Sequence, residues 1–149
     1  MKHKVMRITT FVLAVFGALT TIAGGIGLLT GMIQTPREWL QGSPFVDYTI
    51  PGLALAVIVG GSMLFAAATI LTRREIGVLA SAFTGLTMII FEIVEIAVVD
   101  RIAGSSLLIA ASLQAFYLAL GLAVVGLASA LWMSEYRSHH FTDRLVSHA

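Results

Sequence analysis

The chain has 149 residues, of which 58% are hydrophobic and only 11% are charged, with a formal net charge of +1. A soluble domain carries about 25% charged residues, so this composition excludes an ordinary soluble domain and indicates an integral membrane protein. The absence of cysteine excludes disulfides, thiolate catalysis and cysteine metal sites. The chain also lacks a block of basic residues of the kind that would indicate a nucleic-acid partner.

Four long apolar runs follow one another along the chain. We expect membrane spans at residues 8–33, 50–71, 76–99 and 105–133, a loop at 34–49, and a polar C-terminal tail at 138–149. A span needs about 20 apolar residues, so the four runs nearly exhaust the length and predict a single domain, 1–149. The first run is too long for the core of a cleaved signal peptide, and we interpret it as a retained helix.

Basic residues are distributed unevenly between the two ends of these spans. One end holds Lys2, Lys4, Arg7, Arg73, Arg74, Arg137 and Arg144, and the other holds only Arg37 and Arg101. This positive-inside bias predicts that both termini are cytoplasmic. Short connections make successive spans antiparallel neighbours, so the predicted fold class is all-α, a transmembrane antiparallel up-down four-helix bundle.

Small residues recur at helical spacing within the runs. The first run has Gly27-x-x-x-Gly31, the second has Ala56-x-x-x-Gly60, and the fourth has alanines at steps of four, which are Ala115, Ala119 and Ala123. Such stripes let helix backbones approach closely in a membrane. We favour packing within the bundle, and a homo-oligomer interface is the alternative.

The third run contains two glutamates, Glu92 and Glu95, which share one helix face because they are three residues apart. A carboxylate in a bilayer costs about 2.5–3.5 kcal/mol on insertion scales unless it is neutral, paired or hydrated. At about 1.5 Å per residue, Glu92 lies level with Gln114 of the fourth run, so we expect a hydrogen bond between them. We expect no basic side chain inside a span, and at least one of the two acids to be protonated.

We expect these side chains to line an outward-facing polar pocket. Its predicted members are Glu92, Glu95, Gln114, Tyr117, Thr84 and Met88. In this hypothesis Glu92 exchanges a proton or coordinates a cation, Glu95 is the acid at the entrance, and Gln114 orients Glu92. The alternatives are a protonated glutamate that only fixes helix register, and acids that pair with another membrane protein.

The loop between the first two runs predicts a partly ordered cap. Residues 36–40 fit one helical turn with proline at its first position. Asp47 and Tyr48 suit the capping of the second span, and Trp39 lies near the membrane interface. We expect Phe45 to enter the mouth of the bundle, and we favour capping over a role as a ligand lid.

The sequence shows no pattern typical of a catalytic, haem or metal site. No serine, histidine and acid lie at one depth, no histidine lies in a span to ligate haem, and Met63 is too isolated for a copper path. The histidines of the tail fit a flexible segment better than a metal site; they are His139, His140 and His148. We therefore expect no enzyme activity, no metal and no cofactor.

The segment from Trp39 to Leu53 reads WLQGSPFVDYTIPGL and is followed by Val59-Gly-Gly-Ser62. Together with Leu113-Gln-Ala-Phe-Tyr117, this "SPF-DY-PGL…VGGS" pattern resembles small four-span bacterial integral membrane proteins over roughly residues 39–122. The resemblance implies a location in the bacterial inner membrane and transfers no activity.

The sequence thus predicts a multi-pass protein of the inner membrane that binds or conducts a small ion, proton or ligand. Transport by so small a bundle would require a homo-oligomer. The alternatives are an accessory or scaffold subunit of a membrane complex, and a binder of lipid or another hydrophobic ligand. The identity of the ligand and the oligomeric state do not follow from the sequence.

Overall fold

The computed structural model describes residues 2–72, 74–98 and 107–136. Its long helical segments are α1 (Lys2–Thr30), a second segment built from α2 (Thr49–Leu53), η2 (Ala54–Gly60) and α3 (Gly61–Ile70), then α4 (Glu75–Val98) and α5 (Leu107–Glu135). All four segments are long and apolar enough to cross a membrane, which confirms the predicted all-α four-span bundle. The predicted tail and the predicted turn between the third and fourth spans lie outside the described residues.

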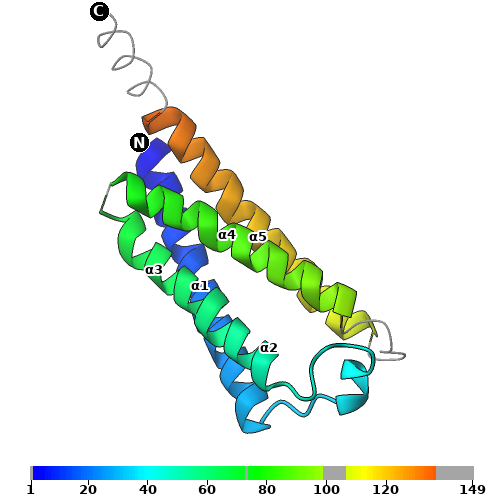
Figure 1. Cartoon of the computed structure of the whole chain (residues 1–149). Coiled ribbons are helices and arrows are strands. Elements are labelled where there is room, and N and C mark those ends of the chain that lie inside the picture. Colours follow the sequence, from blue (N-terminus) through cyan, green and yellow to red (C-terminus); the bar gives the residue numbers. More distant parts are fainter. Residues whose placement is uncertain (1, 73, 99–106, 137–149) are drawn as a thin grey trace, which may run out of the picture.

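The helices run antiparallel in the order in which they follow along the chain. The second segment packs on α1, α4 packs on α3, α5 packs on α4, and α5 also contacts α1. Figure 1 shows α4 and α5 diverging from α1 and α2 toward the end of the molecule that carries the loop. We call this end, with residues 31–48, the loop end, and the end that holds Lys2 and Glu135 the N-terminal end.

Gly31 ends α1 earlier than predicted. Its φ of +73° lies in the left-handed region, which glycine enters without steric cost. The chain then folds back, so that the Ile33 N–H donates to the Gly27 carbonyl at 3.0 Å and the Ile33 side chain covers Gly27. The predicted Gly27-x-x-x-Gly31 packing pair is therefore wrong, because Gly31 lies beyond the helix and Gly27 meets Ile33.

α1 approaches the backbone of the second segment closely at Gly25. A Cβ placed there would lie 2.6 Å from the Gly52 carbonyl oxygen and 2.6 Å from the Ala56 Cβ. Ala56 therefore packs within the bundle, as predicted. The alanine stripe of α5 does not pack within the bundle, because all three of its members are exposed: Ala115, Ala119 and Ala123.

An apolar cluster fills the middle of the bundle. Its buried members are Ala18, Val59, Met63, Met88 and Leu120. Lipid is as apolar as these side chains, so close packing rather than removal from water stabilises the cluster. One polar contact joins α3 to α4 beside it, between the Ser62 and Thr84 hydroxyl oxygens at 2.7 Å.

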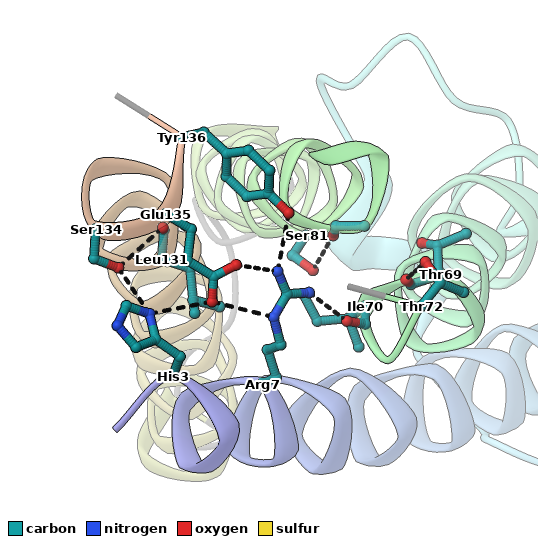
Figure 2. A network of polar contacts seen from close by, with 11 residues as sticks. His3, Arg7, Thr69, Ile70, Thr72, Ser81, Leu131, Ser134, Glu135 and Tyr136 are labelled. Atoms are coloured by element: carbon teal, nitrogen blue, oxygen red, sulfur yellow. Dashed lines mark hydrogen bonds and ion pairs between the residues drawn. The ribbon is translucent and has the colours of Figure 1, made fainter. Parts of the chain in front are cut away.

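Arg7 is only 5% exposed, although it lies in the first helix of a membrane bundle. Its Nη1 donates to the carbonyl of Ile70, the last residue of α3, at 2.7 Å. Its Nε and Nη2 donate to the Glu135 carboxylate, and Nη2 also donates to the Tyr136 hydroxyl at 3.1 Å (Figure 2). One guanidinium therefore connects α1, α3 and the end of α5.

We call Arg7, Glu135, Tyr136 and His3 the N-terminal clasp. The His3 Nδ1 lies 3.1 Å from the Glu135 carboxylate, which adds a second contact between α1 and α5. The sequence places Arg7 in the basic flank before the first span, and the structure shows that this flanking residue is buried at the N-terminal end of the bundle. The physical reason is that the end of α3 leaves carbonyl groups without helical partners, and a guanidinium can satisfy them while it pairs with a carboxylate.

Candidate functional site

A cavity of about 310 Å³ lies at the loop end between the second segment and α4. Its volume falls at the lower end of the range of small-molecule pockets, about 300–1,000 Å³. The loop contributes Trp39, Phe45 and Tyr48 to the lining, and α4 contributes Phe91 and Glu95. We call this space the loop-end cavity.

The walls of the cavity are apolar and reach the outer surface of the bundle. Four of its lining side chains are exposed aliphatic residues, which are Ile50, Ile58, Ile90 and Val94. In a membrane-spanning bundle, exposed apolar side chains at this position face lipid tails. The cavity therefore opens sideways, toward the bilayer.

The second segment departs from α-helical geometry beside the cavity. Residues 54–60 form the π-helix η2, and Ala54, Leu55, Ile58 and Val59 of this stretch line the cavity. π-helical turns are rare and occur frequently at functional sites. Helix irregularity and cavity thus coincide.

Hydrogen bonds hold the loop in place over the cavity. The Tyr48 hydroxyl donates to the Pro36 carbonyl at 3.0 Å, and the Asp47 carboxylate accepts from the Thr49 N–H at 2.9 Å, at the start of α2. This bond satisfies the N–H of the first residue of α2 and holds the pKa of Asp47 below its usual value. The N-cap residue is Tyr48, whose side chain makes no capping bond, so of the predicted pair only Asp47 contributes to the cap. The predicted turn at 36–40 is the 3₁₀ helix η1 (Arg37–Leu40), and Pro36 precedes it instead of occupying its first position.

The polar edge of the cavity consists of Thr35, Tyr48 and Glu95. Burial raises the pKa of the Tyr48 hydroxyl, a hydrogen bond with the Thr35 hydroxyl opposes this shift, and the negative charge of Glu95 reinforces it. Tyr48 and Glu95 line the same cavity, so the acid of α4 lies beside the loop. The structure thus brings Glu95 together with three predicted loop residues, whereas Asp47 does not line the cavity.

Glu92 is 3% exposed and does not line the cavity. Its Oε2 has no hydrogen-bond partner among the described residues, so the predicted bond with Gln114 is not formed at this oxygen. The neighbouring ionisable group, Glu95, is also an acid, so it supplies no positive charge to pair with the Glu92 carboxyl group. A buried polar atom without a partner costs free energy, which makes Glu92 the least satisfied buried side chain in the described part of the chain.

The other predicted pocket residues also lie apart from the cavity. Thr84 and Met88 are buried in the core, and Tyr117 packs against the central apolar cluster. Gln114 is half-buried on α5. In the described part of the chain, no three His, Cys, Asp or Glu side chains are grouped closely enough to hold a metal ion.

Comparison with known proteins gives no match: no protein-family model fits the chain, and no curated protein or solved structure matches it. The resemblance to small four-span bacterial proteins therefore stays a prediction. Any functional conclusion depends on the geometry of the loop-end cavity.

Proposed function

We propose that this four-span integral membrane protein binds an amphipathic small molecule in the loop-end cavity. The observation that carries the proposal is the cavity, with apolar walls and a polar edge at Glu95 and Tyr48. Ligand sites are commonly concave and mostly apolar, with a few polar groups that orient the ligand. The exposed rim at Ile58 and Ile90 supports entry from the bilayer. In this proposal the protein is a binding protein and not an enzyme.

The distribution of basic residues supports a location for the cavity. By the positive-inside rule, the N-terminal end, with Lys2, Lys4 and Arg74, would face the cytoplasm. The loop end would then lie at the outer face of the inner membrane. The ligand would then come from the outer leaflet or the external solution.

Conduction of ions or protons has less support from the same contacts. Next to the cavity the interior is closed by buried Val59, Met63, Met88 and Leu120. A conducting path needs polar groups or hydrated constrictions along its length. The proposed role of Glu92 as a proton or cation site therefore stays a prediction, and ligand binding becomes the favoured function.

Trp39 is a natural reporter for this proposal. It lines the cavity, and the other of the two tryptophans, Trp132, packs against a cluster with Ile70 and Leu131 at the N-terminal end. In Trp132→Phe protein held in a neutral detergent, we expect the amphiphile 12-bromododecanol to quench Trp39 fluorescence with a saturable dependence on concentration. In Trp39→Phe protein, the remaining Trp132 should show only the linear quenching of a probe dissolved in the micelle.

Two matched substitutions of alanine by phenylalanine separate binding in the cavity from a general effect of the probe on the micelle. Ala54→Phe places a ring in the cavity wall and should remove the saturable quenching of Trp39. Ala68→Phe adds the same ring at an exposed position of α3 outside the cavity and should retain it. Linear quenching of both tryptophans would contradict ligand binding, and a stoichiometric co-purifying membrane protein would then favour the accessory-subunit alternative.

A further inference from the structure

We infer that the ligand of the loop-end cavity carries a cationic ammonium head group, which rests on the proposed binding function and names the class of molecule bound. The lining combines four aromatic side chains with one carboxyl group; they are Trp39, Phe45, Tyr48, Phe91 and Glu95. A cation within about 6 Å of an aromatic ring is attracted to the ring face, and groups of aromatic residues are a common device for binding quaternary ammonium ions. This combination favours an organic cation over a neutral or anionic molecule.

The hydroxyl groups of the cavity point to the same ligand chemistry. The single proton of Tyr48 is used in the bond to Pro36, and the Thr87 hydroxyl donates to the Phe83 carbonyl at 2.9 Å. Both oxygens therefore offer a ligand only lone pairs. A positively charged or hydrogen-bond-donating head group matches these acceptors, whereas a carboxylate or phosphate would receive no hydrogen bond from either hydroxyl.

The one carboxyl group of the lining favours the same class of ligand. Among the lining residues that the structure describes, Glu95 is the one carboxylic acid, and none is lysine, arginine or histidine. Charges interact more strongly in an apolar environment than in water, so a cationic head group would favour the ionised form of Glu95 and gain from it.

The placement of these groups also orients the ligand. Glu95 and Tyr48 mark the polar edge beside the loop, and the exposed Ile58 and Ile90 mark the apolar rim between η2 and α4. The head group would lie among the loop aromatics and Glu95, and the alkyl chain would leave the cavity over this rim into the bilayer.

Three probes with one brominated chain and different head groups test the inference on Trp132→Phe protein. They are 12-bromododecyltrimethylammonium, 12-bromododecanol and 12-bromododecanoate, and Trp39→Phe protein corrects each for partition into the micelle. We expect the ammonium probe to half-saturate the quenching of Trp39 at a concentration about tenfold below that of the alcohol. The carboxylate should bind most weakly.

The outcomes separate this inference from the proposed function. Equal half-saturation by the ammonium and the alcohol would overturn the cationic head group while leaving the binding function in place. Linear quenching by all three probes would overturn the binding function as well.

Variants then assign the selectivity to named side chains. Glu95→Gln should weaken ammonium binding more than alcohol binding, so that the preference for ammonium over alcohol falls several-fold. Glu38→Gln, at an exposed acid of η1 outside the cavity, should keep the full preference. Phe45→Leu keeps the cavity apolar, removes one ring, and should weaken ammonium binding more than alcohol binding. If the Glu95 variant does not fold, the Phe45→Leu variant tests the cationic head group alone. A preference for ammonium over alcohol that stays unchanged in a folded variant of Glu95 or Phe45 would contradict the inference.

Discussion

The two ends of the bundle treat buried ionisable groups in opposite ways. Arg7 and Glu92 are both almost completely buried in the membrane-spanning helices, with 5% and 3% of their surface exposed. The Arg7 guanidinium is satisfied by groups from two other helices, whereas the Glu92 Oε2 has no partner among the described residues. A buried polar group that has its partners is explained by helix packing, but one that lacks a partner is a cost for which packing gives no reason.

The packing differs in the same way. At the N-terminal end, the clasp closes α1 against α5. At the loop end, α4 and α5 diverge from α1 and α2, and the loop and its cavity occupy that end (Figure 1). Proteins depart from local consistency mainly where function requires it. We therefore assign stability chiefly to the clasp and binding to the loop end.

The largest effect should come from breaking the clasp. Arg7→Met replaces the guanidinium by an apolar side chain of similar length, so the Glu135 carboxylate and the Ile70 carbonyl lose the Arg7 donors. We expect the free energy of unfolding to fall by roughly 3 kcal/mol, measured by circular dichroism in mixed micelles of dodecyl maltoside and sodium dodecyl sulfate.

Lys4→Met is the matched control, because Lys4 lies one turn away on α1 and is exposed. It should change the free energy by less than about 0.5 kcal/mol. Equal effects of the two substitutions would show that the clasp has no special part in stability.

Glu92 offers the opposite test. Glu92→Leu removes the unpartnered oxygen and should raise the free energy of unfolding by about 1–3 kcal/mol in the same assay. Glu95→Leu should give no comparable gain, because Glu95 is only half-buried at the polar edge of the cavity. Destabilisation by Glu92→Leu would mean that a bound group or a neighbouring molecule satisfies the carboxyl in the membrane.

Gly25 tests whether the loop end also depends on close helix contact. Gly25→Ala places its Cβ against the backbone of Gly52 and Ala56, so α1 and α2 must separate, at a cost of about 1–2 kcal/mol in the unfolding assay. Gly61→Ala meets no atom within 4 Å and should be neutral or stabilising by up to about 1 kcal/mol, because alanine favours the helix. A neutral Gly25→Ala would show that this contact is looser than the structure indicates.

Hydropathy and connection lengths predict the helices well because both act over long stretches of chain. The number of spans, their antiparallel order and the cap at Asp47 follow from the sequence. The clasp does not, because its contacts join Arg7 to residues 63 and 128 positions away, and periodicity along one helix carries no information about such partners. Glu135 also lies beyond the predicted end of the fourth span.

The cavity shows a finer limit of sequence reasoning. Spacings of three and four placed Thr84, Met88, Glu92 and Glu95 on one stripe of α4. In the structure Glu95 lines the cavity, whereas the other three, at steps of four, lie on a neighbouring face away from it. Which face meets a cavity depends on where helices diverge, and hydropathy does not encode that divergence. Phe91, next to Glu92, is one of several lining residues that the sequence does not predict.

The smallest effect should come from the cap at Asp47, which tests how strongly charge orders the loop end. The Thr49 N–H lowers the pKa of Asp47 from its ordinary 3.8, so the bond stabilises the folded loop above that pH and is lost as the pH falls through the lower folded value. Asp47→Ala should therefore reduce the fluorescence anisotropy of Trp39 in Trp132→Phe protein at neutral pH. The two proteins should converge at acid pH, below the ordinary pKa of 3.8, where Asp47 becomes protonated. Asp47→Asn keeps an acceptor and should retain part of the anisotropy at both pH values. An anisotropy difference between the two proteins that does not change with pH would mean that the Asp47 side chain orders the loop by its shape and not by its charge. Charge would then stabilise the N-terminal end through the clasp and would not order the loop end through Asp47.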